Sequence, residues 1–95
     1  MNSEIIHKLR ELKPILKEKY GIEEFAVFGS VAKGLDTEKS DVDIAILKMK
    51  IKSGFDLIRA KNFLTEVLKK DVDMGTFDSM KTFIKNRIKK DFIYV

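Results

Sequence analysis

The sequence predicts a small α/β domain of the α+β kind, with a mixed sheet flanked by helices, and three observations support this. Segments with helical periodicity alternate with short apolar runs along the chain. The connection from Phe28 to Asp41 is too short for a right-handed crossover with a full helix, so the first two strands should be antiparallel. The chain has 95 residues, which predicts one domain spanning residues 1–95.

The first half of the chain begins with an amphipathic helix over residues 3–20, in which Pro14 predicts a kink or a division into two short helices. Residues 25–28 form an apolar run that is typical of a buried strand. A Gly-Ser turn follows, and residues 31–35 are expected to form a short helix. Apolar residues then alternate with Asp41, Asp43 and Ala45, which predicts a strand with one apolar face.

The second half begins with a basic connector over residues 48–54. The helical period returns from Phe55 and ends near residues 69–70, and residues 71–77 are expected to form a third short strand. Asp78 or Ser79 should then cap a last helix that runs to about Lys90. The apolar end, residues 92–95, should either pack on the domain or contact a partner or a second copy.

The composition excludes several kinds of site. The chain has no cysteine and one histidine, which excludes disulfides, thiolate metal sites and multi-histidine zinc sites. Nineteen Lys and Arg against 15 Asp and Glu give a formal charge of +4, which suits an anionic ligand without requiring nucleic acid. No apolar run approaches the roughly 20 residues that cross a membrane, and the start does not resemble a signal peptide. We therefore expect a cytoplasmic protein with no membrane partner.

Two carboxylates mark the first candidate site. Asp41 and Asp43 project from one strand face with Cα atoms about 6.5–7 Å apart. Both cannot stay ionised on a dry face without a compensating cation, and Mg²⁺ is the natural choice for oxygen ligands. Asp73 on the third strand could complete a cluster, and two ions held there would clamp the attacking and leaving oxygens of a phosphoryl transfer.

Gly29 and Ser30 mark the second candidate site. A strand, a Gly-Ser turn and a helix start would direct unpaired N–H groups at an anion, with Lys33 one turn further on. Each feature alone has a plainer interpretation, since a Gly-Ser pair is usually only a turn and two alternate aspartates are usually a solvated strand face. A P-loop is excluded because Leu35 stands where that motif needs lysine.

Taken together, these features resemble a known family. Gly29-Ser30 followed by Asp41-Val42-Asp43 is similar to the Gly-Ser…Asp-x-Asp motif of the DNA polymerase beta-like nucleotidyltransferase superfamily. The segments FGSVAKG, SDVDIAIL and DVDMGTF resemble its smallest members, the minimal nucleotidyltransferases (MNT domains). The resemblance covers essentially the full length and implies a polymerase beta-like fold.

The resemblance also implies roles for individual residues. Gly29 and Ser30 would hold the phosphates of ATP or another nucleoside triphosphate, and Lys33 stands where the group commonly has arginine. Lysine keeps the charge but loses the bidentate fork. The third family carboxylate fits Asp73 better than Asp71. The implied catalytic and Mg²⁺-binding residues, for two ions, are Asp41, Asp43 and Asp73.

The implied activity is that of a protein adenylyltransferase, which moves AMP from ATP to a hydroxyl of a partner protein. Minimal members typically pair with HEPN-type toxins as antitoxins, some by modifying a tyrosine. The alternative is a binding module of the same fold that neutralises its partner by occlusion. A nucleic-acid binder is a third reading, but the lysines of the last helix are more simply a solvated face, with no aromatic residues interleaved.

Overall fold

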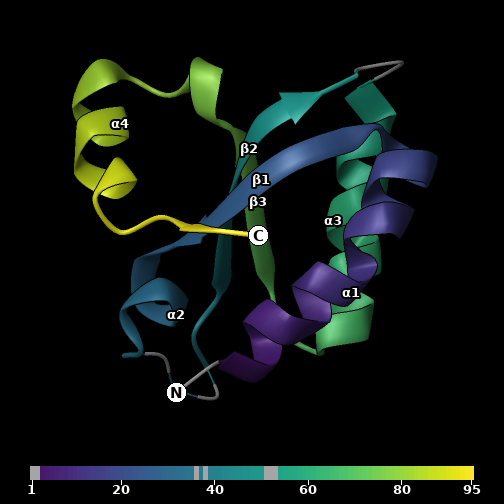
Figure 1. Cartoon of the computed structure of the whole chain (residues 1–95), viewed down its shortest axis with the longest axis horizontal. Helices are drawn as coiled ribbons and strands as arrows, with labels where there is room; N and C mark the ends of the chain where they lie inside the picture. Colours follow the sequence, from purple (N-terminus) through teal and green to yellow (C-terminus); the bar gives the residue numbers. More distant parts are fainter. Residues whose placement is uncertain (1–2, 36, 38, 51–53) are drawn as a thin grey trace.

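The computed structural model describes residues 3–35, 37, 39–50 and 54–95. Four strands form one sheet in the order β3-β2-β1-β4, and helices flank it (Figure 1). This confirms the predicted mixed α/β fold. The elements in chain order are α1 (Ser3–Tyr20), β1 (Ile22–Phe28), α2 (Gly29–Lys33), β2 (Val42–Met49), α3 (Gly54–Leu68), β3 (Val72–Thr76), the 3-10 helix η1 (Phe77–Ser79), α4 (Thr82–Lys89) and β4 (Ile93–Tyr94).

The sheet is mixed in the way that the short first connection predicts. β1 pairs antiparallel with β2 and with β4, whereas β2 pairs parallel with β3. Only the five-residue α2 lies between β1 and β2, while α3 provides the crossover between the parallel strands. This topology places β2, which carries the first carboxylates, between β1 and β3.

The two faces of the sheet are covered differently. α1 and α3 lie on one face, and α2 and α4 lie on the other side near opposite ends of the sheet (Figure 1). Val42, Ile44 and Ile46 on β2 are buried in the core beneath α1 and α3. Because strand side chains alternate, Asp43 and Ala45 lie on the other face, which is the side of α2 and α4 (Figure 1). Core residues from the helices and from β1 and β3 include Leu9, Leu16, Phe25, Val27, Leu64 and Val72.

Several bounds of the elements differ from the sequence predictions. β1 begins at Ile22 rather than at residue 25, and α2 spans Gly29–Lys33 rather than residues 31–35. α1 runs unbroken through Pro14, so the division into two helices is wrong. The third strand stops at Thr76 and the last helix starts at Thr82, because a 3-10 turn lies between them. Of the basic connector, residues 51–53 lie outside the described residues.

The C-terminal residues pack on the domain itself. Ile93 and Tyr94 form β4 against Val27 and Ala26 of β1. The Val95 N–H donates to the Phe25 carbonyl, and Lys13 Nζ donates to the Val95 carbonyl at 2.7 Å. Of the two alternatives for this apolar end, the structure therefore supports packing on the domain. Across the described residues, no helix has the length and apolarity needed to span a bilayer.

Candidate active site

The candidate site is built on one row of residues across three strands. In the sheet register, Phe28 of β1 pairs with Asp43 of β2, and Asp43 pairs with Asp73 of β3. Neighbouring strands lie about 4.7–4.9 Å apart, so both aspartates lie side by side on the open face. Asp41 stands two residues before Asp43, just ahead of the strand, and lines a cavity together with Asp73. The structure thus places Asp73 beside Asp43, with Asp41 just ahead of β2.

The two neighbouring aspartates disfavour the ionised form of Asp43. Burial raises the pKa of Asp43 above its usual range, and the negative charges of Asp73 and then Asp41 raise that pKa further. Asp41 and Asp73 are exposed, whereas Asp43 is half-buried. A cation among them would relieve the repulsion.

The chemistry of these side chains suits a hard divalent cation. All three offer only oxygen donors, and Mg²⁺ is usually bound by one or two carboxylates together with phosphates and water. Within the described ranges, no group of three or more acidic, histidine or cysteine side chains is already gathered as a ligand cluster. The exposed side chains of Asp41 and Asp73 would have to turn toward a bound ion, and their exposure leaves them free to do so.

Gly29 lies directly against Asp43. Its φ of +73° is in the left-handed region that favours glycine. A Cβ atom at this position would overlap the Asp43 Oδ2 atom. Glycine therefore allows the turn between β1 and α2 to touch the central carboxylate, and α2 begins at that point.

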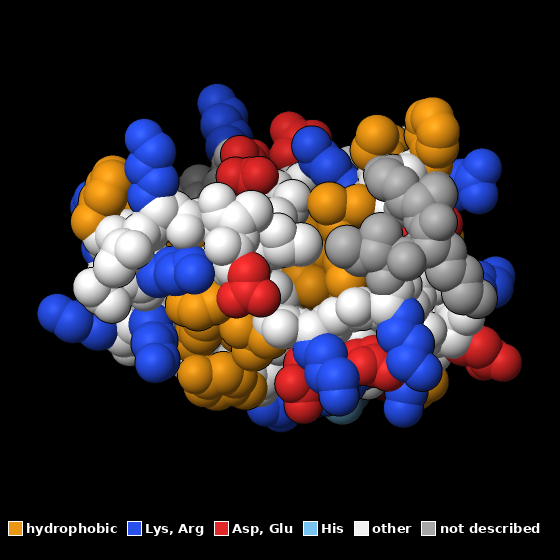
Figure 2. Space-filling model, turned by 90° about the horizontal axis from the view of Figure 1, so that it is seen from above, with side chains coloured by type: hydrophobic (Ala, Val, Ile, Leu, Met, Phe, Trp, Pro, Cys, Tyr) orange, Lys and Arg blue, Asp and Glu red, His pale blue; other side chains and the backbone are white. Residues whose placement is uncertain are grey.

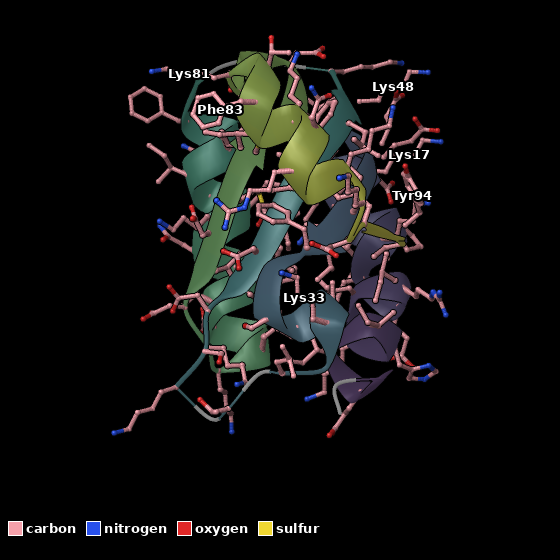
Figure 3. The ribbon with its side chains drawn as sticks, turned by 90° about the vertical axis from the view of Figure 1, so that its left-hand side faces the viewer. Lys17, Lys33, Lys48, Lys81, Phe83 and Tyr94 are labelled. Carbon is pink, nitrogen blue, oxygen red and sulfur yellow. The ribbon has the colours of Figure 1, made fainter. Side chains whose placement is uncertain are left out.

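Lys33 has a protein partner that the sequence did not reveal. Its Nζ lies 3.5 Å from Oδ2 of Asp91, which follows α4, and the two side chains are 50% and 35% exposed. Lys33 lies on α2 near the space between α2 and α4 (Figure 3). Asp91 is far away in the sequence, and no local pattern points to this contact.

An aromatic cluster lies on the face of the sheet that carries Asp43. The Phe92 ring contacts the rings of Phe28, Phe77 and Tyr94 at centroid distances of 6.1, 5.5 and 5.8 Å. Lys85 Nζ of α4 lies 5.3 Å from the centre of the Phe77 ring. These contacts join the C-terminal residues to β1 and η1, and Lys85 joins α4 to η1.

A polar groove at the β3 edge was missed by the sequence reasoning. Its cavity of about 330 Å³ is lined by Asp41 and Asp73 together with Lys61, Asn62 and Thr65 of α3. A second cavity of about 400 Å³ continues from Asp41 and Thr65 to the end of α3. The only available signal was the polar face of α3, which reads as an ordinary solvated surface.

Basic side chains do not form a continuous surface on the face that Figure 2 shows. Lys and Arg are spread along its rim, with acidic and apolar side chains between them (Figure 2). Two connector lysines, Lys48 and Lys50, lie 3.6 and 3.9 Å from carboxylate oxygens of Glu23.

Comparison with known proteins identifies the family of the chain. The sequence profile of the nucleotidyltransferase domain family matches residues 9–95. The chain belongs to this family, and the prediction that it is a nucleotidyltransferase is confirmed.

The relatives of the chain within this family are named as protein adenylyltransferases. A protein of Methanocaldococcus jannaschii, named provisionally as a protein adenylyltransferase, is 40% identical over 94 residues, which is 98% of this chain and 96% of the relative. Protein adenylyltransferase MntA of Thermococcus cleftensis is 34% identical over 83 residues, which is 87% of this chain and 84% of the relative. The predicted resemblance to minimal nucleotidyltransferases is confirmed.

Solved structures share the fold. A protein described provisionally as a minimal nucleotidyltransferase superposes with a TM-score of 0.78 and 26% identity, covering 98% of this chain and 95% of that chain. A toxin–antitoxin structure with AMP-PNP gives a TM-score of 0.72 and 23% identity, covering 99% and 72%. A tri-AMPylated HEPN toxin of Shewanella oneidensis in complex with its MNT antitoxin gives 0.70 and 20%, covering 99% and 71%.

Proposed function

We propose that the chain is a Mg²⁺-dependent protein adenylyltransferase that moves AMP from ATP to a tyrosine hydroxyl of a HEPN-type toxin. In this role it acts as an antitoxin in the cytoplasm. The observation that carries the proposal is the row in which Gly29, Asp43 and Asp73 lie side by side. The names of the relatives and the toxin–antitoxin neighbours support transfer to a HEPN-type toxin.

The proposed roles follow the positions along this row. Gly29 and Ser30 bind the β- and γ-phosphates through backbone N–H groups and the serine hydroxyl, and Lys33 adds positive charge nearby. Asp41, Asp43 and Asp73 hold two Mg²⁺ ions. Bound Mg²⁺ would neutralise the carboxylates and stabilise the negative charge that develops on the transferred phosphoryl group.

The reaction is a displacement at the α-phosphorus of ATP. The acceptor hydroxyl oxygen forms a bond to that phosphorus, and the bond from the phosphorus to the oxygen bridging the α- and β-phosphates breaks. Pyrophosphate leaves with the electron pair of the broken bond. The hydroxyl proton passes to the Asp73 carboxylate, which lies on the side of the row away from Gly29.

Label transfer tests the proposal. Wild-type protein, Mg²⁺ and α-labelled ATP should label a co-purified HEPN-type partner, and Asp43→Asn should reduce the labelling by at least about 10²-fold while the complex survives. Glu18→Gln makes the same carboxyl-to-amide change on α1, away from the open face, and should leave labelling unchanged.

Asp43→Asn also distinguishes an antitoxin that acts by catalysis from one that acts by occlusion of its partner. If Asp43→Asn protects cells from the partner as well as the wild type does, the antitoxin works by binding and the catalytic proposal for its biology fails. If protection and labelling are lost together while binding persists, chemistry is required.

A further inference from the structure

We infer that the groove between α3 and the β3 edge receives the acceptor as an extended peptide whose hydroxyl is flanked by acidic residues. This inference rests on the proposed function, and it adds where the acceptor enters and what sequence it carries. The groove joins the two cavities described above, which share Asp41, Thr65 and Asp71 in their linings.

The position of the groove follows from the in-line geometry of phosphoryl transfer. The attacking and leaving oxygens lie on opposite sides of the transferred phosphorus. Gly29 stands at the β1 end of the row, so pyrophosphate leaves toward β1. The acceptor hydroxyl must then approach from the β3 side of Asp43, where the groove lies beside Asp73.

β3 also suits an extended peptide because it stands at one end of the sheet. The outer backbone groups of an edge strand are available to pair with an added chain. On the opposite wall of the groove, the Asn62 amide and the Thr65 hydroxyl offer both donors and acceptors. A peptide between these walls could satisfy its own backbone groups.

The charges of the groove favour acidic residues around the hydroxyl. Four lysines line the two cavities, namely Lys39, Lys61, Lys69 and Lys70, and of these Lys70 also donates to the Thr37 carbonyl. Asp41 and Asp73 are assigned to the metal ions in the proposed function, which leaves Asp71 as the remaining acidic residue among the described residues of the linings. Lysines that surround a path to the site would attract and orient acidic side chains.

The left-handed backbone conformation of Lys69 makes Lys69→Gly an informative substitution. Lys69 lies just after α3 with a φ of +56°, the left-handed conformation that glycine adopts more easily than any other residue. Lys69→Gly therefore removes one groove charge while relieving backbone strain. A loss of peptide binding in this variant would not come from unfolding.

A peptide fits the linings better than an RNA end does. None of the residues given for the two cavities is aromatic, and single-stranded RNA is usually held by bases stacked on aromatic rings. RNA is therefore an alternative occupant that the experiment must exclude.

Site-specific photocrosslinking tests the inference. A benzoylphenylalanine side chain replaces Asn62 in the groove or, as the control, Lys17, which lies on α1 away from β3 (Figure 3). The probes are a peptide with a central tyrosine between glutamates, its lysine-flanked counterpart and a single-stranded RNA. We expect the acidic peptide to crosslink at position 62 and not at position 17. Equal crosslinking at both positions, none at either, or preferred crosslinking of the RNA or the basic peptide would overturn the inference.

Binding measurements add the charge dependence. By fluorescence anisotropy in the presence of Mg²⁺, Lys61→Glu and Lys69→Gly should each weaken binding of the acidic peptide by about fivefold or more, and Lys17→Glu should not. Unchanged binding in both groove variants contradicts the inference. If the peptide binds in the groove but no acceptor is ever labelled, the proposed function fails and the groove stands. If the HEPN-type partner is labelled and the groove variants do not change the labelling, the proposed function stands and the inference about the groove fails.

Discussion

Gly29 touches the Asp43 carboxylate so closely that the turn after β1 and the central aspartate of β2 form one unit. A Cβ atom at position 29 would overlap Asp43 Oδ2, and the positive φ of Gly29 permits the approach. In the proposed function, this contact brings the phosphate-binding turn against the metal-binding carboxylates. Any change that separates the two should affect folding and catalysis together.

Gly29→Ala tests that contact directly. Alanine at this φ costs about 1–2 kcal/mol of folding free energy, and the overlap with Asp43 adds to the cost. Gly34→Ala is the matched control, since Gly34 has a φ of +70° but no atom within 4 Å of an added Cβ. Urea denaturation should show a larger loss for Gly29→Ala, and only Gly29→Ala should abolish label transfer. Equal losses of stability in the two variants would show that the overlap has no effect.

Asp43→Asn should stabilise the protein at neutral pH without Mg²⁺. The folded state raises the pKa of Asp43 above about 3.8, so the folded protein binds that proton more tightly than the unfolded chain does. Ionised Asp43 is therefore destabilising above the raised pKa, and this cost disappears as the pH falls below 3.8. Because solvent screens a half-buried group, we expect a gain in Tm of about 1–3 °C at pH 7 and none at pH 3.5.

Thermal unfolding at the two pH values measures this difference, with the exposed Asp78→Asn as the control. A stabilisation by Asp43→Asn that grows as the pH falls would have the wrong sign and would refute the electrostatic account. Mg²⁺ should raise the Tm of the wild type more than that of Asp43→Asn, because a ligand stabilises only a fold that binds it.

Lys33→Ala should weaken ATP binding more than it weakens the fold. Its ion pair with Asp91 is half-exposed, and such pairs contribute about 0–1 kcal/mol to stability. We expect the KM for ATP to rise about fivefold or more and the Tm to change little. Lys33→Arg keeps the charge and should retain ATP affinity. An unchanged KM in Lys33→Ala would show that Lys33 serves only to hold Asp91.

Phe92→Ala should destabilise the C-terminal part of the fold. Phe92 contacts three rings and joins the segment after α4 to β1, η1 and β4. We expect a loss of about 1–3 kcal/mol, less than for a fully buried phenylalanine. Phe83→Ala is the control because the Phe83 side chain on α4 is 67% exposed. Urea denaturation compares the two, and a similar small loss in both would exclude a structural role for the cluster.

Much of the candidate site could be read from local patterns. Strand alternation places Asp41 and Asp43 on one face because side chains alternate with a period of two. The short link from Phe28 to Asp41 requires antiparallel strands, and glycine at position 29 permits the turn. These features depend on residues close in sequence, so one chain read in order is enough to predict them.

The tertiary structure decided what depends on distant segments. The pairing of Asp43 with Asp73 is set by the parallel register of β2 and β3, and the Lys33–Asp91 contact is set by how the chain returns after α4. The groove beside Lys61 exists because α3 crosses back along the β3 edge. A local pattern determines which face a side chain takes, but only the packing of separate elements determines which side chains meet there.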